Sequence, residues 1–265
     1  MQYDKTRHLF QPDSNLEDVV TRYYFDKELR LILFDAIETI EITLRTKMIY
    51  HLSQSYGGLW YCDPELFADA AFHARHLKEL MEEFLRSNEI FVKDYKRKHF
   101  VTNTDGERIL DEYPDAWIIF EVATFGTLSK IYKNLNHQLP EKSAIANDMG
   151  LNLHSELSGW LEAISYMRNI IAHHSRVWSR NMVKRPCEIR NPRMAWLSRP
   201  LTEVQQKKPF YVITAMLYLC NAIDEGHTFK EKLLALFKEY ADVPIYKIGF
   251  FNRWEEEPIW KKMSE

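Results

Sequence analysis

The chain has 265 residues, of which 46% are apolar and 14% aromatic, so it can bury a sizeable core and is not an intrinsically disordered protein. Its formal net charge of −3 excludes a protein that is drawn to nucleic acid by its overall field, so such contacts must come from local clusters. No stretch approaches the roughly twenty apolar residues of a membrane span, and the polar N-terminus lacks the apolar core of a signal peptide. We therefore expect a cytoplasmic protein without membrane contact.

Cysteine and histidine spacing gives no sign of a metal centre. The three cysteines are odd in number and far apart, which favours reduced intracellular thiols over a disulfide framework. His73 and His76 are spaced for one helix face but lack obvious further ligands. We predict no metal site and no cofactor.

Only eight glycines and a repeated helical spacing of apolar residues predict an all-α fold, built as one domain over residues 1–265. The first half of the chain is expected to hold one or two helices over 16–55, a helix opened by Asp63-Pro64 and running to about Arg86, a short helix over 91–100, and an exposed turn over 101–108.

The second half is expected to hold a helix over 116–135 bent near Phe125-Gly126, a short helix over 140–150, a helix over about 153–180, an ordered excursion over 187–208, and a C-terminal helix with an aromatic tail over about 208–265. We expect the tail to pack back on the core, because so much exposed aromatic surface would favour aggregation.

The helix over 153–180 carries the residues with the clearest chemistry, in the run 168–174 (RNIIAHH). If the helix continues through this run, Asn169 and His173 share a polar face, and the long side chain of Arg168 reaches the same cleft. His174 falls on the apolar face and is expected to be a partly buried neighbour. Helical geometry thus favours His173 as the working imidazole.

These residue types suit cleavage of RNA by its own 2′-hydroxyl. An imidazole with a pKa near neutrality accepts the 2′-hydroxyl proton or donates one to the leaving 5′-oxygen. A guanidinium stabilises the charge that builds on the phosphoryl oxygens, and the amide of Asn169 orients the histidine or the sugar. For an arbitrary sequence the simpler interpretation is that Arg168 and Asn169 are solvated and both histidines are structural.

Basic residues follow the motif directly, as a phosphate-tracking groove would require, and between 176 and 193 only Glu188 opposes them. We predict that RNA contacts Arg176, Arg180, Lys184 and Arg185. The alternative is a solvated loop whose counter-charges come from elsewhere in the fold. A second basic run, Lys93–His99, lies far from the motif in sequence and is more simply a solvated face.

The segment Arg168–Arg180 (RNIIAHHSRVWSR) resembles the signature of the Abi-like (abortive infection) proteins, a branch of the HEPN superfamily with an R-x4–6-H motif. His173 completes that motif with four intervening residues and His174 with five. Further segments resemble the family in the expected order: Phe25–Arg45, Phe91–His99, Asp115–Leu135 and Ile248–Trp260. Two departures are a short region ahead of Phe25, where longer members have extra helices, and Ser179, where the family often has Asn.

The resemblance implies a HEPN-like helical bundle with additional helices and a homodimer in which two motifs face each other. It also implies a metal-independent endoribonuclease of a bacterial anti-phage or toxin system that leaves 2′,3′-cyclic phosphates. RNA is the expected partner, and an antitoxin or a structured non-coding RNA is a further candidate. Two alternatives stay open: a catalytically silent RNA-binding or regulatory HEPN module, and a docking surface for a protein partner.

Overall fold

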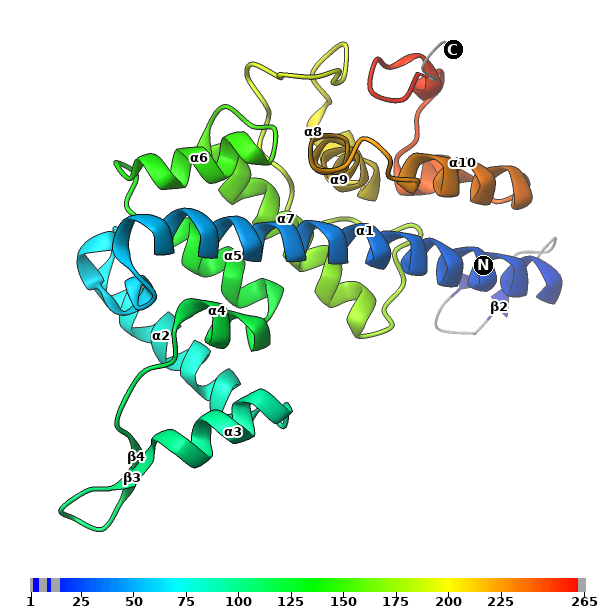
Figure 1. Ribbon diagram of the computed structural model, residues 1–265. Helices are drawn as coiled ribbons and strands as arrows, with labels where there is room; N and C mark the ends of the chain where they lie inside the picture. The colour runs from blue at the N-terminus through cyan, green and yellow to red at the C-terminus, as the bar shows by residue number, and fades with distance from the viewer. Residues whose placement is uncertain (1, 5–8, 11–14, 262–265) are drawn as a thin grey trace.

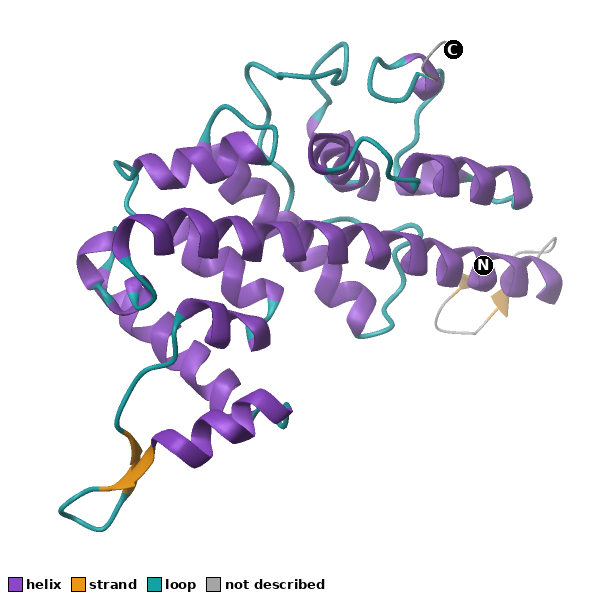
Figure 2. Cartoon of the chain, viewed as in Figure 1, coloured by secondary structure: helices purple, strands orange, loops and turns teal. Residues whose placement is uncertain are grey.

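The computed structural model describes residues 2–4, 9–10 and 15–261, and helices form nearly all of its regular structure (Figure 2). The prediction of an all-α fold is confirmed. Strands occur as two short antiparallel hairpins, β1 (Gln2–Asp4) with β2 (Leu9–Phe10) and β3 (Phe100–Thr102) with β4 (Arg108–Leu110). None of the helices in these described ranges combines the length and the apolarity that a bilayer crossing requires.

The central element is α1 (Leu16–Tyr56), a helix of 41 residues (Figure 1). The sequence predicts one or two helices in this region, and the structure has one. It contains neither Pro nor Gly, and Asn15 caps it by accepting the N–H of Asp18 at 2.6 Å. Buried side chains recur every three or four residues from Phe25 to Leu52. One face of α1 is therefore part of the core along most of its length.

Five of the later helices pack around α1. These are α5 (Phe125–Asn134), α6 (Pro140–Asp148), α7 (His154–Ala172), α9 (Pro209–Ile223) and α10 (Phe229–Glu239). In α9 the first twelve residues are all buried and none is charged, so α9 belongs to the interior. Trp160 of α7 is fully buried, stacks on Trp196 at 5.1 Å and meets Tyr218 edge-on at 5.5 Å.

Between α1 and α5 the chain forms an arm whose first long helix packs on α5 and whose far part extends away from the other helices (Figure 1). Two 3-10 turns, η1 (Trp60–Cys62) and η2 (Pro64–Leu66), precede its helices α2 (Ala70–Arg86) and α3 (Ile90–His99), and the β3–β4 hairpin follows them. The chain returns to the body through α4 (Ala116–Ile119) and η3 (Phe120–Val122).

Two sequence predictions in this region have different outcomes. The helix expected to open at Asp63-Pro64 is wrong in its start, because these residues open η2 and α2 begins at Ala70 with Asp69 as its cap. The expected bend near Phe125-Gly126 is confirmed, since η3 ends before Thr124, which caps α5 by accepting the N–H of Thr127.

The aromatic tail packs on the core, as expected. After the short α8 (Glu203–Gln206) and the two long helices α9 and α10, the tail forms η4 (Ile245–Ile248) and η5 (Trp254–Glu256). Phe250 lies 4.8 Å from both Phe210 and Phe237 and 4.7 Å from Trp254, measured between ring centroids.

The helix expected over about 153–180 ends at Ala172, so its predicted C-terminal part is wrong. A loop follows, and it is attached to α1 by Asp26, a carboxylate that is only 5% exposed. One oxygen of Asp26 accepts the backbone N–H groups of Val177 at 2.9 Å and Trp178 at 2.5 Å, and the other accepts from Arg30 at 3.2 Å. The buried charge is thus compensated by three donors, and it fixes the path of the loop.

We predict that Asp26→Ala lowers the free energy of unfolding by about 3–5 kcal/mol, because it leaves two buried amides and a half-buried guanidinium without their acceptor. Urea unfolding at neutral pH measures the change. The control is Asp35→Ala on the same helix, where the exposed pair with Lys232 should contribute no more than about 1 kcal/mol. Equal losses in the two variants would contradict the role given to Asp26.

Candidate functional site

The motif 168–174 lies across the end of α7. The N–H of His174 donates to the carbonyl of Ile171 and the N–H of Ser175 to that of Ile170, both at 2.9 Å. This pair of bonds is a Schellman motif, which ends a helix with one residue in the left-handed region. His174 takes that position with φ +53°, although glycine is the residue that adopts it most easily.

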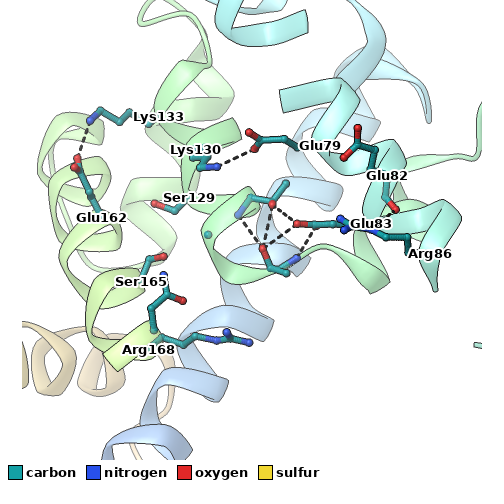
Figure 3. A pocket seen from close by; sticks show the side chains of 14 residues that line it. Glu79, Glu82, Glu83, Arg86, Ser129, Lys130, Lys133, Glu162, Ser165 and Arg168 are labelled. Atoms are coloured by element: carbon teal, nitrogen blue, oxygen red, sulfur yellow. Dashed lines mark hydrogen bonds and ion pairs between the residues drawn. The ribbon is translucent and has the colours of Figure 1, made fainter. Parts of the chain in front are cut away.

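Arg168 and Asn169 line a cleft of about 570 Å³ between α2, α5 and α7 (Figure 3). Both side chains therefore reach the same cleft. Arg168 is half-buried and makes no ion pair with any carboxylate in the described part of the chain. Its guanidinium remains available to a ligand.

The remainder of this cleft is charged but electrically balanced. Lys130 pairs with Glu79 at 2.8 Å, and Lys133 pairs with Glu162 at 2.7 Å. Glu83 accepts hydrogen bonds from the N-terminal turn of α5. Four lining carboxylates stand against four cations, in the sets Glu79, Glu82, Glu83, Glu162 and Arg86, Lys130, Lys133, Arg168. Because the charges cancel, the cleft by itself is no phosphate-tracking groove.

Arg168 also acts on α1. Burial raises the pKa of Glu41, while the charges of Arg45 and Arg168 oppose that rise. Glu41 and Arg45 form an ion pair within α1, four residues apart and at 3.1 Å. The motif arginine therefore lies within electrostatic range of Glu41 on α1, a residue more than 120 positions away in sequence.

The two histidines of the motif are both exposed to solvent. The prediction of a partly buried His174 is wrong, because it assumed that α7 continues past Ala172. His174 lines a second depression, of about 290 Å³, between α1 and the loop that follows α7. Its other lining residues are Val19, Arg22, Tyr23, Asp26, Arg30, Arg176 and Trp178. In a single chain, Arg168 and His174 thus line different depressions, and His173 lines neither.

The four residues predicted to contact RNA fall into two groups. Lys184 pairs with Glu162, which it shares with Lys133. Arg185 lies 3.9 Å from Glu203, which also pairs with Lys207, so both residues have a counter-charge nearby from elsewhere in the fold. Arg176 and Arg180 make no ion pair with any described carboxylate; Arg180 donates to the carbonyl of Arg176 at 2.7 Å. Of these four residues, only Arg176 lines the depression that contains His174.

Arg22 and Arg30 were not among the residues singled out from the sequence. They lie one turn of α1 on either side of Asp26, at a spacing of four residues that places all three on one face. That spacing is visible in the sequence, but nothing in it indicates that the face meets the loop after α7. The contact spans 151 positions of sequence separation.

No three of the His, Cys, Asp and Glu side chains in the described ranges are grouped so that they could hold a metal ion. His73, one of the two histidines considered above, donates from Nε2 to the carbonyl of Tyr61 at 2.9 Å and stacks on Phe67. Its position is accounted for by packing.

Hydrogen bonds from Lys133 and Lys184 hold the pKa of Glu162 below its usual range. A depressed folded-state pKa stabilises the fold above the unfolded value of about 4.5, and this contribution is lost as the pH falls through the folded value. We predict that Glu162→Gln lowers the free energy of unfolding by roughly 0.5–1 kcal/mol at pH 7, and that the difference from wild type closes below about pH 4.5.

Urea unfolding at both pH values checks this prediction. Glu82→Gln is the control, because the exposed Glu82 only approaches Lys78, at 4.0 Å, and its replacement should leave the free energy of unfolding unchanged. A difference between Glu162→Gln and wild type that persists undiminished in acid would count against the ion pairs as its cause.

The model of the protein family described as Abi-like protein matches residues 1–179 of this chain. The matched span includes helices α1 through α7 and the motif. No curated protein and no solved structure matches the chain.

Proposed function

Since this chain belongs to the Abi-like protein family, we propose that it acts in abortive infection as an endoribonuclease that uses the motif 168–174. The observation that carries the proposal is the state of the motif at the end of α7. Arg168 has no ion-pair partner among the described residues, and the imidazoles of His173 and His174 are exposed within the next two turns.

The reaction that these groups support is an internal displacement. The 2′-oxygen attacks the adjacent phosphorus and an imidazole accepts its proton, while the bond from phosphorus to the 5′-oxygen breaks. A protonated imidazole gives its proton to that 5′-oxygen, and Arg168 stabilises the charge on the phosphoryl oxygens. The products are a 2′,3′-cyclic phosphate and a 5′-hydroxyl, so protons and charge balance without a water molecule.

A second copy of the chain would complete this set, because Arg168 and His174 line different depressions in one copy. The surface of α1 supports such a dimer. Along roughly 30 Å of this helix, apolar side chains that are 42% to 63% exposed recur at helical spacing. They are Val20, Tyr24, Leu31, Phe34 and Ile42, and we call them the α1 stripe. In the proposed dimer, the stripe of one copy packs against that of the other, as a two-fold interface allows.

One observation favours the rival function, a catalytically silent RNA-binding module. The cleft at Arg168 holds as many carboxylates as cations, so RNA would meet no net attraction there. In that case RNA binds to the basic surface near His174, and Arg168 only positions α7 against α1. The two functions differ in whether new RNA ends appear.

We predict that Arg168→Ala, and the double variant of His173→Ala with His174→Ala, each lower the cleavage rate of labelled RNA at least about a hundredfold. The assay contains EDTA, and the ends are analysed for 2′,3′-cyclic phosphate. Arg75→Ala, an exposed arginine on α2 that lines neither depression, is the control and should cleave normally. The single histidine variants then identify the working imidazole.

Retained cleavage in the double histidine variant, with wild-type circular dichroism, would reject the catalytic assignment. Salt-sensitive RNA binding by the wild type without any new ends would support the silent module instead.

We further predict that the wild type is a dimer and that Leu31→Glu combined with Phe34→Glu makes it a monomer that no longer cleaves RNA. The reason is that two carboxylates in the α1 stripe would face each other across the two-fold axis without water. Light scattering after size exclusion gives the mass. Ile90→Glu, at an exposed apolar position on α3, is the matched control and should remain dimeric. A monomeric wild type that cleaves RNA would contradict the dimer.

A further inference from the structure

The depression beside His174 has the charge and shape of a binding site in its own right. Its volume of about 290 Å³ is at the small end of ligand pockets, about 300 Å³, which suits one nucleotide better than a longer segment. One wall is α1 and the other is the loop after α7, so two elements far apart in sequence build it. No step of the cleavage chemistry proposed above uses this wall of α1.

The lining carries a net positive charge. Three arginines, Arg22, Arg30 and Arg176, stand against the single carboxylate of Asp26, which leaves a charge of +2. The oxygens of Asp26 are already engaged by two backbone amides and by Arg30, so they do not neutralise Arg176. Arg22 has only Asp18 nearby, at 3.5 Å and with both side chains partly exposed. The free charge suits a phosphate group.

The site is held rigid before any ligand arrives. The ring of Trp178 is 3% exposed, and the guanidinium groups of Arg22 and Arg176 each lie over it, 5.8 Å from its centroid. Asp26 holds the backbone of the same tryptophan to α1. The arginines are therefore fixed by stacking on a buried ring, and a ligand pays little to order them.

An exposed aromatic ring lines the depression next to these arginines. Tyr23 is 61% exposed, lines the depression and is braced edge-on by Tyr24 at 5.5 Å. An exposed ring next to fixed arginines is the combination with which proteins hold unpaired bases, by stacking on the ring and by contacts to the phosphate. A base within a duplex is already stacked and cannot reach such a ring.

We propose that this depression is a subsite for one unpaired nucleotide of RNA, with its base on Tyr23, its phosphate on Arg22 and Arg176, and the neighbouring sugar beside His174. The subsite rests on the proposed function and deepens it, because it names single-stranded RNA as the substrate and gives the path by which the strand reaches the motif. Arg176, which makes no ion pair with a described carboxylate, lines this depression and not the balanced cleft.

The test measures binding separately from cleavage. A short fluorescein-labelled RNA with 2′-O-methyl groups, which block attack by the 2′-oxygen, is titrated with the full chain over a series of salt concentrations. Arg176→Gln should weaken binding about tenfold and lower the slope of log affinity against log salt by about 0.7, the value for one phosphate contact on a single strand. Tyr23→Ala should weaken binding by a similar factor and leave that slope unchanged, because stacking releases no counterion.

Arg75→Gln is the matched control. The guanidinium of Arg75 also lies over an aromatic ring, 5.2 Å from that of Phe72, but it is on α2 and outside the depression. The RNA affinity and the salt slope of Arg75→Gln should therefore equal those of the wild type. Circular dichroism and light scattering establish that each variant keeps its fold and its oligomeric state. A loss in Tyr23→Ala is then a loss of stacking, although Tyr23 adjoins the α1 stripe.

Wild-type affinity and slope in both variants would overturn the subsite, as would a wild type that binds no RNA or binds the matching duplex equally well. Cleavage of unmodified RNA is scored independently. A protein that binds as described but never cuts would retain the subsite and lose the nuclease. One that cuts with an unaffected Arg176→Gln variant would retain the nuclease and lose the subsite.

Discussion

The carboxylate of Asp26 is the constraint on which the arrangement of the motif depends. It is buried within α1 and accepts hydrogen bonds from the loop after α7, so it joins two segments 151 positions apart. A buried carboxylate is tolerated only when donors surround it, and here the donors are the amides of Val177 and Trp178 together with Arg30. The direction in which α7 ends and the burial of Trp178 follow from this one group.

The same attachment separates two environments that the sequence presents as one run of basic and polar residues. On one side of α7, Arg168 faces a cleft in which glutamates and lysines are already paired. On the other side, His174 faces three arginines: Arg22 and Arg176 lie over the ring of Trp178, and Arg30 pairs with Asp26. Phosphate is attracted where the field is unbalanced. In the function proposed above, an RNA strand meets the histidine side first, and the arginine of the motif is reached from there or from a second chain.

Most of the helices could be predicted from apolar spacing, and the errors have local causes. A helix over 153–180 is predicted because Trp178 would fall on the apolar face if the helix continued. Trp178 is buried, but it belongs to the loop that follows α7. Neither Gly nor Pro marks the true end near Ala172. At Asp63-Pro64 the start signal is real, but it opens a single 3-10 turn, because the next residues pair with Leu135 before α2 begins.

The site could be predicted only where its parts are neighbours in sequence. Arg168 and Asn169 reach one cleft, as expected for adjacent residues on a helix. The ion pairs of Lys184 and Arg185, and the contribution of Arg22 and Arg30, depend on which helices meet, and a single sequence does not contain that information. The charge clusters in the sequence thus overestimated how many basic residues lack a nearby carboxylate.

The loop after α7 contains two residues other than glycine whose backbone lies in the left-handed region. They are His174 with φ +53° and Ser179 with φ +58°. A backbone of this kind costs roughly 1–3 kcal/mol for an ordinary side chain, and Asn tolerates it better than Ser. The Asn that Abi-like proteins often carry at the place of Ser179 suits that geometry. At His174 the chain keeps an imidazole where glycine would be less strained, so the loop gives up conformational stability at the very residue that faces the arginines.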